Sequence, residues 1–213
     1  WACKGRPNLK KKRSKNPIDQ LEKIKQQERL YSAKNIERLE PREHVRRRPR
    51  MYIGGIDNRA LHHMIFEVLD SSIDSAFEGK CDQIVITLQP DNWVTIKDND
   101  TIFPNQLATD TRTWKEYSQI DRLVYLVGNA GPKWATKYNV EGGLHGVGWQ
   151  AVNSLSTEVT TTIRYNNTIW KRAYREGLPY TPQQKYQSTT HEPDGVEITF
   201  QPDFTIFDAN DFD

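Results

Sequence analysis

Four glycines within seven residues mark the segment of the chain best suited to hold a phosphate group. The run reads Gly142, Gly143, Leu144, His145, Gly146, Val147, Gly148. Because glycine carries no side chain, the backbone N–H groups of such a loop can lie directly against phosphate oxygens. The residues that follow are spaced like the first turns of a helix, whose N-terminus would add a favourable dipole. A plain glycine-rich connection has the same composition, so the loop alone leaves both interpretations open.

A second candidate group lies on a segment that reads as one helix, residues 60–78, which contains no Pro or Gly. At about 100° per residue, its apolar and small side chains share one side, which must face a core; they are Leu61, Ile65, Val68, Leu69, Ser72 and Ala76. The opposite side carries Glu67, Asp70, Ser71 and Asp74. An acidic stripe of this kind is either part of a site or a solvated helix face.

These motifs occur in an order that resembles a known family. The matching segments are residues 49–54 (Pro-Arg-Met-Tyr-Ile-Gly), 61–70, 73–74, 142–148 and 151–155. They are similar to the N-terminal ATPase domain of DNA gyrase B and its topoisomerase IV relative, from about Tyr31 to the end of the chain. No Gly-x4-Gly-Lys-Ser/Thr loop is present, which agrees with a family that holds ATP by the Bergerat (GHKL) arrangement instead.

The resemblance implies a role for two carboxylates. Glu67 matches the general base that orients and deprotonates the water attacking the terminal phosphate, a task suited to a carboxylate. Asp98, which follows the strand-like residues 93–97, matches the acceptor of the adenine amino hydrogen. The resemblance also implies that ATP and Mg²⁺ are the ligands.

The resemblance extends to a wider set of nucleotide contacts. Besides the loop at 142–148, it implies Asp70, Ser71, Asp74, Pro104, Lys133 and Lys137, with Tyr31 as an arm residue that reaches a partner subunit's site. The two lysines would also be ordinary solvated loop residues in the absence of a ligand, and Tyr31 would also serve simply to anchor an arm.

The chain departs from the family at the same pocket. Ser71 stands where the family has the Asn that binds magnesium, and a hydroxyl is a poorer metal ligand than a carboxamide. Residues 98–102 read Asp-Asn-Asp-Thr-Ile where the family has Asp-x-Gly-x-Gly, so both glycines are absent. Ser75 and Thr101 replace a Glu–Arg ion pair, and Val196 replaces an adenine-binding Thr. The prediction is an ATP-binding module with weakened or lost hydrolysis, and the alternative is a non-catalytic interaction protein that keeps the fold.

Charge divides the 213-residue chain into a basic arm and an acidic body. Residues 1–50 contain 17 Lys and Arg against 6 Asp and Glu, and the remainder contains 13 against 22. We predict a partly disordered or helical arm at 1–30 and the ATPase domain at 31–213. The basic run Arg46, Arg47, Arg48 is interpreted as a contact to DNA phosphates, with a solubilising or acidic-partner tail as the alternative.

The order of segments predicts an α+β fold. Strands are expected at 82–88, 93–97, 158–164, 168–174 and 196–201, with a helix at 114–126 and a tight turn at Asn166-Asn167. Helices would pack on one face of a mixed, mainly antiparallel sheet, as in a Bergerat-type sandwich. The chain has no stretch of about 18 apolar residues, and its two cysteines are isolated, which favours a cytoplasmic setting; the basic start is also compatible with an organelle address. A gyrase-A-like subunit or a second copy is the partner that the resemblance implies.

Overall fold

A computed structural model describes residue 25 and residues 39–100, 108–110, 115–125, 147–189 and 192–212. The fold lies in one compact unit, Glu40–Asp213. The predicted arm at 1–30 and its boundary fall outside the described part, apart from residue 25.

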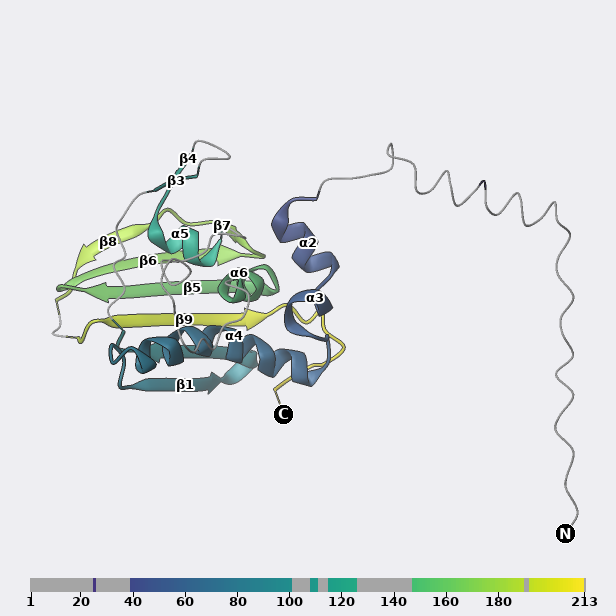
Figure 1. The fold of residues 1–213 in the computed structure, drawn as a ribbon, viewed down its shortest axis with the longest axis horizontal. Helices are drawn as coiled ribbons and strands as arrows, with labels where there is room; N and C mark the ends of the chain where they lie inside the picture. The colour runs from purple at the N-terminus through teal and green to yellow at the C-terminus, as the bar shows by residue number, and fades with distance from the viewer. Residues whose placement is uncertain are drawn as a thin grey trace, which may run out of the picture. The chain divides into compact units, whose positions relative to one another are not determined.

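A seven-stranded sheet forms the base of this unit (Figure 1), and every pairing described within it is antiparallel. Its order is β1 (Ile84–Gln89), β2 (Trp93–Asp98), β9 (Gly195–Pro202), β5 (Ser156–Tyr165), β6 (Thr168–Arg175) and β7 (Leu178–Pro179), with β8 (Gln184–Gln187) also paired to β6. A short separate pair consists of β3 (Ala108–Asp110) and β4 (Lys115–Tyr117).

Helices pack against this sheet, with α4 on β2 and α6 on β5 and β9 (Figure 1). The helices of the unit are α2 (Pro41–Arg47), α3 (Arg50–Ile53), α4 (Asn58–Phe77), α5 (Gln119–Val124) and α6 (Gly148–Ser154), and a 3-10 turn, η2 (Pro90–Asn92), joins β1 to β2. Helices α2 and α5 pack mainly on α6, and α3 packs on both α4 and α6. The predicted α+β class with a mainly antiparallel sheet is confirmed.

The long helix α4 buries the face that the sequence pattern predicts, although it runs over Asn58–Phe77 where residues 60–78 were expected. Asp57 caps the N-terminus by accepting a hydrogen bond from the Ala60 backbone N–H at 3.2 Å. The buried positions are Ala60, Leu61, Met64, Ile65, Val68, Ser72 and Ser75. The expectation for Ala76 was wrong, because this residue is exposed in the last turn of the helix, beyond the edge of the packed surface.

The strands on either side of the predicted hairpin are confirmed, and one helix prediction needs correction. Asn166 and Asn167 adopt positive φ angles of 47° and 57°, as a tight turn between β5 and β6 requires. Of the predicted helix 114–126, residues 115–117 form strand β4, and the helix begins only at Gln119. The Ser118 side chain accepts a hydrogen bond from the Asp121 N–H at 3.2 Å, and this cap sets the start of the helix.

Arg46 joins three elements at one end of the fold. Its guanidinium donates to the buried carboxylate of Asp203 at 2.5 Å and to the carbonyl of Ser154, the last residue of α6, at 2.9 Å. Burial alone would raise the pKa of Asp203, but hydrogen bonds from Thr205 and Arg46 outweigh it, so the pKa is lowered. The ionised carboxylate therefore stabilises the folded state.

We expect Asp203→Asn to lower the free energy of unfolding at pH 7 by about 1–3 kcal/mol, because Arg46 loses its partly buried partner. Because the pKa of Asp203 is lower in the folded state, its ionised carboxylate adds stability at pH values above the unfolded-state pKa of about 3.9. This added stability is lost as the pH falls through the folded-state pKa. Urea unfolding at pH 3–7 should therefore show the two proteins converging in acid. Asp208→Asn, at an exposed carboxylate on the same segment, is the matched control and should change little. A constant difference between Asp203→Asn and the original protein down to pH 3 would contradict this role.

Candidate functional site

Glu67 and Gly148 meet where α4 packs against α6. A Cβ atom built on Gly148 would overlap the Glu67 carboxylate and would lie 2.9 Å from the Glu67 backbone oxygen and 3.1 Å from its Cβ. Only glycine therefore permits this approach. The carboxylate of the acidic helix thus lies against the final residue of the glycine-rich run, as a site built from both would require.

His63 lies beside the Glu67 side chain, one turn earlier on α4. Its Nε2 lies 3.5 Å from a carboxylate oxygen of Glu67, and its Nδ1 lies 2.9 Å from the carbonyl of Ile53. A carbonyl only accepts, so Nδ1 carries the proton, and Nε2 faces the carboxylate. The sequence interpretation gave no role to His63, although its four-residue spacing from Glu67 was a usable signal.

Asp98 is buried at the end of β2 and is held by three hydrogen bonds. Its Oδ1 accepts from the backbone N–H groups of Asp100 at 3.1 Å and Val196 at 3.3 Å, and its Oδ2 accepts from the Ser72 hydroxyl at 2.5 Å. Burial raises the pKa of Asp98 above its ordinary value, although the hydrogen bonds act in the opposite direction. Oδ2 retains a lone pair that can accept one further donor.

Asp100 forms a second bond of the same kind to α4. Its carboxylate is buried and accepts a hydrogen bond from the Ser75 hydroxyl at 2.5 Å. Both residues are departures from the resembled family, and the structure places them in contact. The neutral Ser75 hydroxyl gives the Asp100 carboxylate a hydrogen-bond donor but no counter-charge, in contrast to the Glu–Arg ion pair of the resembled family.

We expect Asp98→Asn to separate ligand recognition from stability. The amide can accept the two backbone N–H groups at Oδ1 and donate to Ser72 through Nδ2, so the packing is kept. Because the pKa of Asp98 is raised in the folded state, its ionisation lowers the stability as the pH rises from the unfolded value of about 3.9 through the folded value. Asparagine does not ionise, so the free energy of unfolding at pH 7 should be unchanged or higher in the variant. Affinity for an adenine nucleotide should fall at least about tenfold, because the amide presents N–H groups to the adenine amino group. Equal binding by both proteins, measured by calorimetry, would remove Asp98 from the site.

The remaining acidic residues of α4 lie along the flank that carries Glu67. Burial raises the pKa of Asp70, and the nearby carboxylate of Asp74 adds to this shift, whereas His63 opposes it. Ser71 and Asp74 are partly buried on the same helix. Within the described residues no group of three or more His, Cys, Asp or Glu side chains is placed to hold a metal ion. The resemblance suggests Ser71 as the residue that would hold a magnesium ion here.

Two buried polar side chains fix the elements that flank residues 126–146. Asn153 of α6 donates to the carbonyl of Val124, the last residue of α5, at 3.0 Å. Asp121 of α5 accepts from the Tyr174 hydroxyl and pairs with Arg172, both at 3.0 Å. These contacts join α5 to α6 and to β6.

Several predicted site residues lie outside the described part of the chain, namely Tyr31, Pro104, Lys133, Lys137, Gly142, Gly143, Leu144, His145 and Gly146. Val147 is described and precedes the first residue of α6. Of the predicted DNA-contact arginines, Arg46 is bound to Asp203 and Ser154, whereas Arg47 and Arg48 are exposed.

Comparison with known proteins gives a consistent result. Residues 56–206 match the family model described as "Histidine kinase-, DNA gyrase B-, and HSP90-like ATPase". The DNA gyrase B protein of Haloferax volcanii is 38% identical over 194 residues, which cover 88% of this chain and 29% of the relative. Its counterpart in Thermotoga maritima is 38% identical over 184 residues, covering 86% and 28%, and that of Metamycoplasma hominis is 34% identical over 197 residues, covering 92% and 29%. The chain therefore spans less than a third of the length of these relatives.

Proposed function

Because the chain belongs to the family of histidine kinase-, DNA gyrase B- and HSP90-like ATPases, we propose that it binds ATP between the Glu67 flank of α4 and the start of α6. The contact between the Glu67 carboxylate and Gly148 is the observation that carries this proposal. It supports a role for Glu67 beside the phosphates, where a carboxylate accepts the proton of an attacking water. Asp98, with one acceptor position still open, is proposed to receive the adenine amino group.

The same site is proposed to hydrolyse ATP slowly. Ser71 would be a weak magnesium ligand, and magnesium supplies the charge neutralisation that phosphoryl transfer needs. Asp100 adds a second buried carboxylate beside Asp98. A nucleotide base would therefore approach two acidic side chains, whereas a glycine at position 100 would let it approach bare backbone. Weak binding and reduced turnover follow from both changes.

We expect Ser71→Asn to raise the rate of phosphate release at saturating ATP and Mg²⁺ by about tenfold, because the carboxamide oxygen is a better metal ligand than a hydroxyl. Ser71→Ala is the matched control and should not increase the rate. Adding Glu67→Ala to Ser71→Asn should abolish the gain while leaving nucleotide binding largely intact. A rate that is unchanged in Ser71→Asn would refute magnesium coordination as the defect, and turnover that survives Glu67→Ala would refute the general base.

The role of a larger protein around this domain is also a proposal. The similar proteins are DNA gyrase B chains, so we propose that the chain acts within a type II topoisomerase, with a gyrase-A-like subunit or a second copy as partner. The alternative is a non-catalytic interaction protein that binds DNA or another protein through its basic arm. Deleting residues 1–30 should flatten the salt dependence of DNA binding if the arm contacts phosphates. A cytoplasmic location stays a prediction; in the described residues, no helix has the length and apolar run needed to cross a bilayer.

A further inference from the structure

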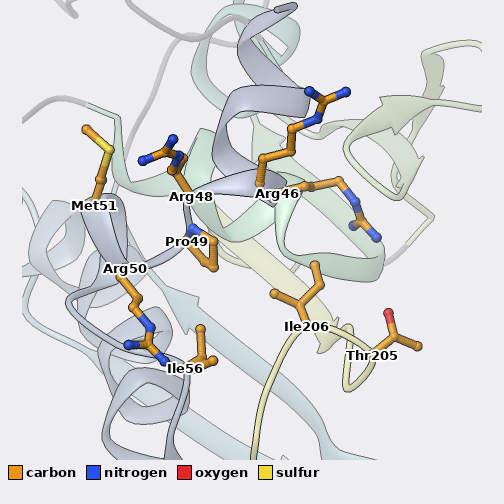
Figure 2. Close-up of a pocket in the computed structure, with 9 residues that line it drawn as sticks. Arg46, Arg48, Pro49, Arg50, Met51, Ile56, Thr205 and Ile206 are labelled. Carbon is orange, nitrogen blue, oxygen red and sulfur yellow. The ribbon is translucent and has the colours of Figure 1, made fainter. Parts of the chain in front are cut away.

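A basic hollow lies away from the proposed nucleotide site, between the α2–α3 connection and the segment that follows β9. Its volume is about 510 Å³, and the residues that define its chemistry are Arg48, Pro49, Arg50, Met51, Ile56 and Ile206. Figure 2 shows Arg48, Pro49 and Arg50 on one side and Thr205 and Ile206 on the other. No role in ATP binding requires this hollow.

The arginines around the hollow divide into two kinds. Arg46 is neutralised by Asp203, and Arg47 is paired with Glu43 at 2.6 Å. Arg48 and Arg50 are exposed, and among the described residues neither guanidinium has a hydrogen bond or an ion pair. Two like charges line one hollow with no counter-charge among its described lining residues, which favours an anionic ligand.

The two walls of the hollow are held in place before any ligand binds. The Asp208 N–H donates to the Ile56 carbonyl at 2.8 Å, and the Asp203 N–H donates to the Leu155 carbonyl at 2.9 Å. The Arg46–Asp203 pair links the same segments. A hollow whose walls are already joined loses little conformational entropy on binding.

The lining between the arginines is apolar, and this determines the class of ligand. Pro49, Ile56 and Ile206 are partly buried, and the Met51 side chain is 66% exposed beside them. A ligand that fills this hollow must carry an apolar group between negative charges. A duplex backbone supplies the charges without the apolar group, and among the described residues that line the hollow none is aromatic and able to stack on an unpaired base.

We propose that this hollow binds an acidic peptide segment of a protein partner, with carboxylates at Arg48 and Arg50 and an apolar side chain against Met51 and Ile206. Charge complementarity with the two unpaired arginines is the basis for choosing this occupant. Met51, flexible and polarisable, suits an apolar contact that adapts to the inserted side chain.

The proposal is tested on the full chain with a fluorescein-labelled peptide in which Asp and Glu flank Leu and Phe. Polarisation should report saturable binding that weakens at least about tenfold in the Arg48→Glu, Arg50→Glu double variant. Met51→Ser in the protein, or Ser in place of Leu and Phe in the peptide, should weaken binding about threefold or more. Lys171→Glu, a single charge reversal at an exposed position on β6, should bind like the original protein.

Three results would overturn the proposal, with circular dichroism confirming that each variant is folded. No binding of the acidic peptide at high micromolar concentration would remove the site. Equal binding by the double arginine variant would place the peptide elsewhere on the protein. The third result is that a labelled DNA duplex binds in preference to the peptide. If this binding is lost in the double arginine variant and unchanged in Met51→Ser, the hollow binds nucleic acid.

Discussion

Gly195→Ala should destabilise the fold by about 3 kcal/mol, the largest effect on stability that we expect from a single methyl group. A Cβ at this position would overlap the Asp98 carbonyl oxygen and lie 3.2 Å from the Asn99 Cα. These neighbours are backbone atoms of Asp98, the last residue of β2, and of Asn99 after it, so no side chain can rotate to make room. β9 would have to move away from β2, which would break the bond from the Val196 N–H to Asp98.

Urea unfolding monitored by tryptophan fluorescence would measure this loss. Gly79→Ala is the matched control, because Gly79 has a φ of +72° but no atom within 4 Å of its added Cβ. That substitution should cost only the left-handed backbone penalty of about 1 kcal/mol. If Gly195→Ala lowers the free energy of unfolding no more than Gly79→Ala does, β9 does not approach β2 at Asp98 as closely as described.

Gly148→Ala should remove most nucleotide binding and lower the stability by about 1–3 kcal/mol. The new methyl group would displace the Glu67 carboxylate and press on the Glu67 backbone oxygen, which lies within the rigid helix α4. α6 would therefore shift away from the acidic flank. Thermal unfolding with and without an ATP analogue would report both effects in one experiment.

A double variant separates the two contacts that the methyl group makes. Glu67→Ala removes the overlapping carboxylate but keeps the backbone oxygen 2.9 Å away, so it should recover only part of the stability lost in Gly148→Ala. Two results together would contradict the geometry assigned to this contact. The stability losses of the two substitutions would be strictly additive, and the ATP analogue would stabilise Gly148→Ala as much as the original protein.

The placement of the acidic flank of α4 could be predicted because helix periodicity depends only on neighbouring residues. A spacing of about 100° per residue places Glu67 on a flank different from that of Leu61 and Val68, and the structure agrees. The glycine run was interpreted as backbone that lies against a phosphate, and this stays a prediction; the close approach in the structure is that of Gly148 to Glu67. The turn at Asn166 was equally local, since Asn tolerates positive φ.

Contacts between distant residues could not be predicted in the same way. The Ser75–Asp100 bond depends on the position of β2 against α4, and Arg46 and Asp203 are 157 positions apart in sequence. Nothing in the local sequence around either residue gives that register. The helix predicted at 114–126 was wrong in its first part because Ser118 provides a later start, and a cap outweighs a weak intrinsic propensity.

One titration tests the central claim most directly, which is that the Glu67 flank and the Gly148 turn bind the phosphates of ATP. The melting temperature of the full chain would be followed against increasing non-hydrolysable ATP analogue, with and without Mg²⁺. A ligand that binds only the folded state must raise this temperature in a saturable manner. We predict such a rise for the original protein and its loss in Gly148→Ala. No rise at millimolar analogue would contradict nucleotide binding at this site.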